Sequence, residues 1–499
     1  MEKKSMKTLI HFIIGFAIMI GFRFIPEGIL PEVTPIGLQV LGVFVGTIYL
    51  WTTVDPILGS IASIVMLGFT DWASMNYVLL QGFGNVVLVQ CLFLMIIMGG
   101  LTDRKINNYI ARFILTRKII EGRPWIFTGA IVFGSYLMSV FVGCFAPIFL
   151  FWPVLTSVYE EVGFKKTDLY PKLMTIMVVM AALVGFPVPP YMGNGLALIG
   201  FWQGIVGNAI QNGANIAGAT INTGTYFVSL LILGAILLLA LILLIKFVFK
   251  PDVKPLKTVT IEMLNKNPLP PMDFAQKAYS VVYVIMILCM LLPTLITGVP
   301  ILEFIQNNTY GIGLAITVVL LVIKYNGESL LRFNPVMASK INWGTYFIIA
   351  AALIIGTALT ATPVEGVTEA TGITAFLNAV LSPIFNGMSG TIFTVVILIT
   401  AVVLTNICNS LVIGMILQPV ILSYCAQSGA AAAPIITLLI FTVLLTAAIT
   451  PAASPFAAMM FGNKEFLSNG DIYKYCSVMV VVELVLIIVI GIPFISVLI

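Results

Sequence analysis

Apolar runs of about 20 residues recur along most of the chain, and short polar segments separate them. A helix needs a run of this length to cross the hydrocarbon core of a bilayer. The pattern therefore predicts an all-α polytopic membrane protein with about 11 transmembrane helices. The first run follows the basic stub MEKKSMK and continues into RFIPEG without a small-residue cleavage site, so residues 1–35 are expected to hold an uncleaved first span.

Two apolar segments, 125–157 and 374–425, do not fit a simple crossing. The first lies between two basic loops, is too short for two crossings, and is interrupted midway by GCFAP. The second is interrupted by TNICNS, and it starts and ends on the side opposite to those basic loops. We expect both segments to be re-entrant hairpins that enter the membrane from opposite faces.

Lysine and arginine are concentrated in a few segments, and their distribution predicts the orientation. If the N-terminus is cytoplasmic, all 24 of these residues except Arg23 lie on the cytoplasmic side, as the positive-inside rule requires. We therefore expect a multi-pass protein of the plasma or inner membrane with its N-terminus inside. Within 103–123, one helical face carries Ile106, Ile110, Phe113 and Ile114, which indicates a helix on the cytoplasmic surface; a solvated loop is the alternative.

Proline and glycine break two of the later spans. VGFPVPPYMGNG interrupts the span 173–201, ITPAASPFAAMMFGN interrupts the span 434–462, and both end in Gly-Asn. Proline removes a backbone donor and clashes with the preceding turn, so a break is costly in lipid unless other groups pair with the freed backbone. The interval from Gly143 to Pro189 is 46 positions, and the interval from Cys408 to Ser454 is also 46.

Equal spacing and opposite sidedness predict two inverted repeats, which is the plan of many secondary transporters. Each repeat is expected to hold two spans, a hairpin, a broken span and a plain span. The first repeat covers 36–250 and the second covers 278–499, with the polar segment 251–277 as a cytoplasmic linker. The alternative is that the prolines only kink helices for packing.

The composition narrows the classes of function. With 60% hydrophobic and 9% charged residues and a formal net charge of +4, the chain is membrane-embedded throughout and lacks the basic charge that nucleic acid binding needs. It has one histidine, no HExxH motif and few acids outside loops, so we expect no enzyme activity. A channel would need rings of charge or carbonyls, which the sequence does not offer. The six cysteines form no CxxC pair and are expected to be small buried apolar residues.

A half-helix that begins within the membrane exposes free N–H groups and the positive end of its dipole, which attract anions. No lysine or arginine lies inside any predicted span, so backbone donors and hydroxyls would have to hold an anionic substrate. Asn409 and Ser454 are capping signals for such half-helices, and Pro189-Pro190 is expected to open another. The candidate substrate-binding residues at the tips and breaks are Gly143, Cys144, Phe145, Pro189, Pro190, Asn194, Cys408, Asn409, Ser410, Thr450, Pro451, Ser454 and Pro455.

Carbonyls and hydroxyls near the breaks could also bind a coupling cation. For sodium the candidate ligands are Thr405, Asn409 and Thr450. Glu483 is the only acid within an apolar span and is a candidate proton site; alternatively, its carboxylate reaches a water pocket or bonds a neighbouring helix. No cofactor other than such a coupling ion is expected.

These tips and breaks resemble those of the divalent anion:sodium symporter family, the di- and tricarboxylate transporters of the ion transporter superfamily. Members of that family carry Ser-Asn-Thr at each hairpin tip and a Pro-Pro-Asn-like turn in each broken span. The second tip here reads Cys408-Asn409-Ser410, and the resemblance extends from about residue 36 onward. The first tip reads Gly143-Cys144-Phe145 and lacks the asparagine and hydroxyl, which weakens the case for a sodium site there and suggests a partly apolar substrate or one of smaller charge.

The resemblance implies a secondary active transporter for small organic anions, such as di- or tricarboxylates, driven by sodium or by exchange. It further implies a homodimer and an elevator mechanism, in which the hairpins and broken spans slide against a scaffold and the helix near 103–123 joins the two parts. A proton-coupled or inorganic-anion transporter of the same superfamily is the alternative, and an anion channel is less favoured.

Overall fold

The computed structural model describes residues 2–115, 117–211, 213–260, 269–360, 371–373, 375–376, 379–380, 383 and 387–499. Two sequence predictions lie partly outside these ranges. They concern the start of the segment 374–425 and the middle of the linker 251–277.

The first half of the chain is a series of helices whose starts follow local capping rules. Thr34 caps α2 and Asp55 caps α3, and in both helices a proline occupies the first turn, where its missing N–H costs nothing. The helices of this half are α1 (Glu2–Gly21), α2 (Pro35–Thr53), α3 (Pro56–Leu67), α4 (Met75–Phe83), α5 (Val86–Asp103), α6 (Ile106–Leu115), α7 (Pro124–Val142), α8 (Phe145–Val162), α9 (Leu169–Gly185), α10 (Gly193–Gln211) and α11 (Thr223–Leu244), which continues as a π-helix over Ile245–Phe249.

The second half follows the same order, with a two-stranded hairpin added. Capping boxes open α13 at Asp273 and α23 at Ser468. The elements are α13 (Phe274–Leu295), α14 (Pro300–Asn307), α15 (Thr309–Val322), β1 (Lys324–Tyr325), β2 (Glu328–Ser329), α16 (Phe333–Ser339), α17 (Trp343–Thr360), α19 (Gly390–Thr405), α20 (Ser410–Ser428), α21 (Ala432–Leu445), α22 (Pro455–Gly462), α23 (Asn469–Leu486) and α24 (Ile492–Leu498).

The described residues confirm the predicted all-α membrane architecture. Eight of their helices are long and apolar enough to cross a membrane, or ten if each of two sharply bent pairs counts as one span. The bent pairs are α14 with α15, at 92°, and α16 with α17, at 75°. Between α1 and the first hairpin lie α2, α3, α4 and α5, and α13, α14 with α15, and α16 with α17 precede the second hairpin.

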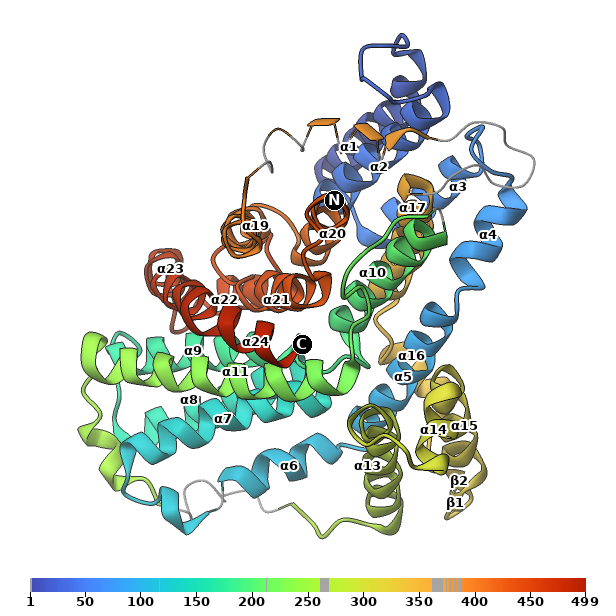
Figure 1. The fold of residues 1–499 in the computed structure, drawn as a ribbon. Helices are drawn as coiled ribbons and strands as arrows, with labels where there is room; N and C mark the ends of the chain where they lie inside the picture. Colours follow the sequence, from blue (N-terminus) through green and yellow to red (C-terminus); the bar gives the residue numbers. More distant parts are fainter. Residues whose placement is uncertain are drawn as a thin grey trace.

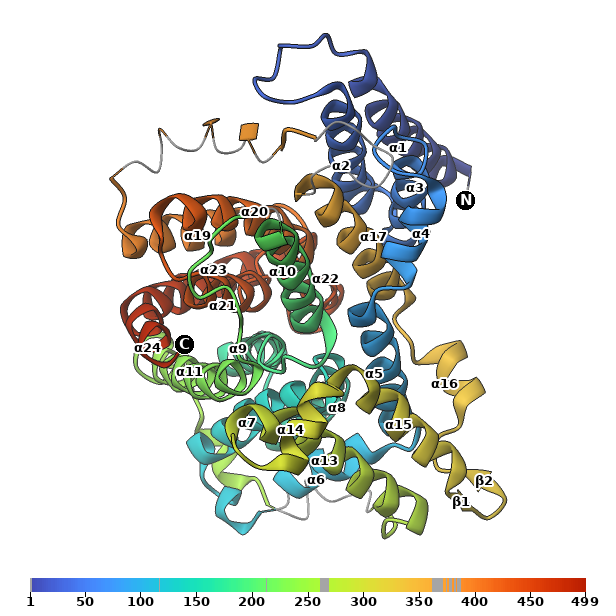
Figure 2. The same cartoon turned by 45° about the vertical axis from the view of Figure 1, so that its right-hand side comes forward.

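The helices form two groups with α10 between them (Figure 1). One group contains α1 to α5 and α13 to α17, and the other contains α7 to α9, α11 and α19 to α24; the turned view shows the same division (Figure 2). Helix α10 packs against α17 and α5 of the first group and against α20 and α21 of the second. At the centre of the second group, α9 and α21 are buried on almost every side, as expected for helices that are hydrophobic all round.

The charged loops of the two halves meet at one end of the molecule. Lys166 pairs with Glu465 at 2.7 Å, and Lys172 pairs with Asp471 at 3.0 Å. The hydrogen bond from Lys166 to the Glu465 carboxylate raises the pKa of the lysine ammonium. These pairs join two of the loops that the charge pattern assigns to the same face of the membrane.

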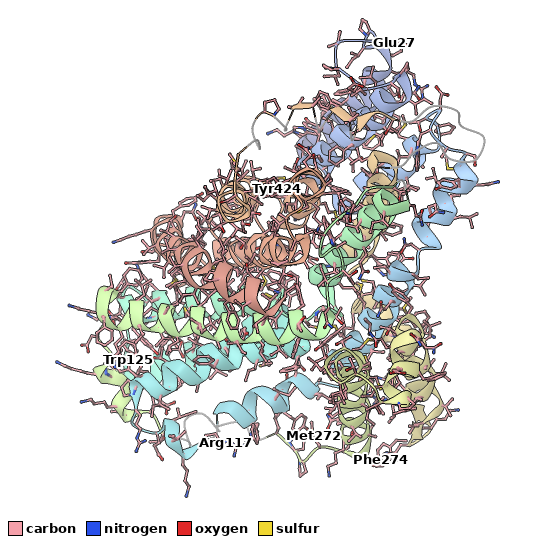
Figure 3. All side chains as sticks on the ribbon, viewed as in Figure 1. Glu27, Arg117, Trp125, Met272, Phe274 and Tyr424 are labelled. Carbon is pink, nitrogen blue, oxygen red and sulfur yellow. The ribbon has the colours of Figure 1, made fainter. Side chains whose placement is uncertain are left out.

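The segment 103–123 contains a helix, α6, over Ile106–Leu115. Ile106 is buried, whereas Phe113 is 66% exposed, and the Arg117 guanidinium lies over its ring at 3.5 Å from the ring centroid. The predicted apolar face is therefore buried at one end and exposed at the other. Figure 3 places Arg117 at the same edge of the molecule as Met272 and Phe274, and Glu27 at the opposite edge.

Candidate site where two hairpins and two broken helices meet

The first hairpin is formed by α7 and α8, which a tight turn at Gly143 and Cys144 connects. Gly143 has φ 113°, a conformation that glycine adopts readily and side chains do not, and its N–H donates to the carbonyls of Met138 and Ser139. The Ser139 hydroxyl donates to the Ala182 carbonyl at 2.5 Å and so ties this hairpin to α9. The hairpin spans 124–162 rather than 125–157, because Gly163 ends α8 in the left-handed conformation.

The first broken span stops at Gly185 and resumes at Gly193, so the predicted interruption is present. The expectation that Pro189-Pro190 opens the second half-helix is wrong, because α10 begins three residues beyond Pro190. A residue before proline is disfavoured in the helical conformation, which keeps Pro189 out of a helix. The Tyr226 hydroxyl donates to the freed Pro187 carbonyl at 2.7 Å, so the protein itself satisfies part of this break.

The second hairpin is formed by α19 and α20, and Asn409 caps α20 by accepting from the Leu411 N–H at 3.0 Å. Its described helices span 390–405 and 410–428 rather than ending at 425, since Gly429 is the left-handed C-terminal residue. The second broken span stops at Leu445 and resumes at Pro455, as the sequence predicts. Ser454 caps α22 through the Ala457 N–H at 3.1 Å and donates to the Ala447 carbonyl at 2.7 Å.

Asn406 joins the second tip to the second break, and the sequence analysis did not single it out. Its amide nitrogen donates to the carbonyls of Val402 and Thr446, and its amide oxygen accepts from the Ile449 N–H at 2.9 Å. Its backbone carbonyl accepts from the Thr450 hydroxyl at 2.7 Å. The feature of the sequence that could have identified Asn406 is its position in TNICNS, the interruption that predicts the second tip.

The four half-helix starts meet through aromatic and backbone contacts. Phe456, in the first turn of α22, lies 4.6 Å from Phe145 of α8 and 5.2 Å from Phe186 of the first break, measured between ring centroids. A Cβ on Gly193, the first residue of α10, would lie 3.2 Å from the Phe186 ring. The Ser410 N–H at the start of α20 donates to the Ala453 carbonyl at 3.1 Å. The interrupted segments are therefore neighbours, and the positive ends of four helix dipoles are directed to one region.

The predicted site residues do not all belong to this meeting point. Phe145, Ser410, Thr450 and Ser454 take part in the contacts that join its elements. Pro190 instead lines a separate cavity on the side of α5 and α13. The remaining predicted residues sit on the same tips and breaks: Gly143, Cys144, Pro189, Asn194, Cys408, Asn409, Pro451 and Pro455.

Several buried polar groups of the described residues have no hydrogen-bond partner, and two of them belong to predicted ion or proton sites. The Thr405 hydroxyl lies at the end of α19, where that helix enters the second tip, and is fully buried. Glu483 on α23 is also fully buried, and neither of its carboxylate oxygens has a partner. Unpaired polar groups in such places are costly to retain, which makes both candidates for ion or proton binding.

Comparison with known proteins agrees with this architecture. The crystal structure of the Alcanivorax borkumensis YdaH transporter, described as having an unusual topology, matches with a TM-score of 0.53 and 13% sequence identity, covering 84% of this chain and 85% of that chain. No curated protein matches the chain. The match to the YdaH structure shows a similar fold.

The family profile described as the sodium:sulfate symporter transmembrane region matches residues 6–499. The chain therefore belongs to this family, the divalent anion:sodium symporters, as its tips and breaks suggest. It is a multi-pass secondary transporter of anions.

Proposed function

We propose that this protein carries small organic anions, most simply di- or tricarboxylates, and that they bind where α8, α10, α20 and α22 begin. The observation that supports this proposal is the meeting of the four half-helix starts around Phe145, Phe186 and Phe456. Helix N-termini supply N–H donors and positive potential for carboxylates without a basic side chain. The aromatic rings supply an apolar surface beside them.

The aromatic surface favours an organic anion over sulfate. Sulfate has no hydrocarbon part, so rings beside the site would only displace the water and donors that it needs. A dicarboxylate carries methylene groups that can pack against the 40% exposed face of Phe145 while its carboxylates meet backbone donors. Inorganic-anion transport is the alternative that the following experiment separates.

Phe145→Ser is expected to raise the KM for succinate roughly fivefold, because the lost aromatic contact is worth about 1 kcal/mol. The same change is expected to leave inhibition of uptake by sulfate unchanged or to strengthen it. Uptake of radiolabelled succinate into proteoliposomes, with sulfate as competitor, measures both effects. Phe149→Ser is the matched control, since Phe149 lies one turn further along α8 and is 64% exposed. Transport of sulfate but not of any carboxylate by the unaltered protein would overturn the proposed substrate class.

We further propose that sodium couples transport at the second tip, with Thr405, Asn409 and Thr450 as ligands. The buried, unpaired Thr405 hydroxyl is the feature that supports a cation there. Proton coupling through Glu483 is the competing hypothesis. Sodium coupling predicts that substitution of Thr405 impairs uptake, whereas proton coupling predicts that substitution of Glu483 does.

Thr405→Val is expected to raise the sodium concentration for half-maximal uptake at least tenfold without lowering the melting temperature. The melting temperature is expected to hold because the hydroxyl has no protein partner to lose. Thr437→Val, which removes another buried unpaired hydroxyl from α21, is the control and should change neither quantity. If uptake instead needs no sodium and Glu483→Gln abolishes its dependence on pH, the proton version holds and the sodium site is wrong.

The remaining parts of the proposal concern the movement, the assembly and the orientation of the protein. The group formed by the hairpins and broken spans would move as an elevator against α1 to α5 and α13 to α17, within repeats covering 36–250 and 278–499. The segment 103–123 would connect the two groups as an arm, and two copies would form a homodimer. The loops joined by the Lys166–Glu465 and Lys172–Asp471 pairs would face the cytoplasm.

A further inference from the structure

A cavity of about 310 Å³ lies between α10 and the helices α5, α13, α14 and α15. One wall of the cavity is formed by Pro190 and Tyr191 in the first break, by α10, and by residues 220–223, which lead into α11. Two hydrogen bonds join this region across its walls: Gln90 of α5 donates to the Met290 sulfur of α13 at 3.8 Å, and Asn222 donates to the Thr294 carbonyl at 3.3 Å. The cavity is separate from the Phe145, Phe186 and Phe456 contacts, since none of these residues lines it.

The lining combines amides and hydroxyls with an apolar wall. Among the described residues that form it, none carries a formal charge. The amides are Gln90, Gln203, Asn222 and Gln306, and they offer both donors and acceptors. Tyr191 also lines the cavity, is only 3% exposed, and has a buried hydroxyl without a hydrogen-bond partner.

We propose that this cavity is a binding site for a small neutral molecule with an amide or similar hydrogen-bonding group and an apolar body. Its volume lies at the lower end of the range for small-molecule sites, and its amides and hydroxyls can hydrogen-bond a ligand beside the apolar part of the wall. These groups are uncharged, and they include both donors and acceptors, which favours a neutral polar ligand over an ion.

A bound molecule would touch both helix groups at once. Met290 and Thr294 belong to α13, whereas Leu196, Ile199 and Gln203 belong to α10. If α10 moves relative to α13 during transport, the ligand holds the two together and inhibits uptake. This consequence depends on the proposed elevator mechanism, but the binding itself does not.

The experiment compares benzamide with benzoate, two molecules of nearly the same shape that differ in charge. Binding is measured on the purified full-length protein by saturation-transfer NMR titration and by the shift in melting temperature, which rises when a ligand binds the native state. We expect benzamide to bind and benzoate to bind at least tenfold more weakly. Gln203→Leu and Gln306→Leu are each expected to raise the dissociation constant of benzamide about tenfold, which corresponds to the loss of one hydrogen bond.

Asn208→Leu on the same helix is the matched control, because Asn208 does not line the cavity. Equal binding of benzamide and benzoate, or unchanged benzamide binding in both cavity variants, overturns the proposal. Competition by succinate at the same site also overturns it, since the cavity is then part of the anion path. If benzamide binds but does not inhibit uptake, the cavity is still a binding site. Only the inference that a bound ligand blocks the movement of α10 relative to α13 is then wrong.

Discussion

Asn409→Ala and Ser454→Ala are each expected to reduce anion uptake by roughly 100-fold or more, equivalent to about 2.7 kcal/mol of lost binding. Both residues cap a half-helix that points at the proposed site, Asn409 through the Leu411 N–H and Ser454 through the Ala457 N–H. Losing a cap costs about 1 kcal/mol locally, which a folded membrane protein can tolerate. The larger effect on transport follows because the positions of the donor N–H groups depend on these caps. Uptake into proteoliposomes, with the inserted fraction measured in parallel, tests the prediction.

Three further substitutions separate the effect of the cap from the effect of charge. Asn409→Ser and Ser454→Thr keep an oxygen acceptor and are expected to retain most of the uptake. Asn409→Asp also keeps the cap but adds a negative charge at the proposed anion site, so uptake should be lost while the protein still folds. Unimpaired transport in both alanine variants would refute the site.

Asn406→Ala is expected to lower both stability and transport, because its side chain forms three hydrogen bonds between the second tip and the second break. Two buried backbone carbonyls and one N–H lose a partner, which costs about 3 kcal/mol or more in total. The Ile449 N–H donates to the Asn406 amide oxygen, so hydrogen exchange at Ile449 should accelerate specifically.

The control for this variant is Asn76→Ala, an exposed position on α4. It should change neither the melting temperature nor uptake. If exchange at Ile449 is unchanged in Asn406→Ala while uptake is lost, then Asn406 acts on the substrate directly and the positioning role is wrong.

Features that depend on a few neighbouring residues could be predicted from the sequence. The caps at Asn409 and Ser454 and the interruptions at both broken spans belong to this class, because proline and side-chain capping act within a turn or two. The first hairpin and the end of the second are predicted to within a few residues, and the errors at these ends arise where Gly163 and Gly429 stop a helix in the left-handed conformation. Pro189 and Pro190 were assigned to a helix start too early, since consecutive prolines delay the start of α10.

Other features depend on packing between distant segments, which local preferences do not encode. The apolar and basic patterns by themselves determined a polytopic helical protein with two proline-broken spans. Only the tertiary structure decided that Phe456 packs against both Phe145 and Phe186, that Asn406 rather than Asn409 joins tip and break, and that Pro190 faces another cavity. The physical reason is that capping and helix breaking are satisfied within one segment, whereas side-chain contacts depend on which helices share an interface.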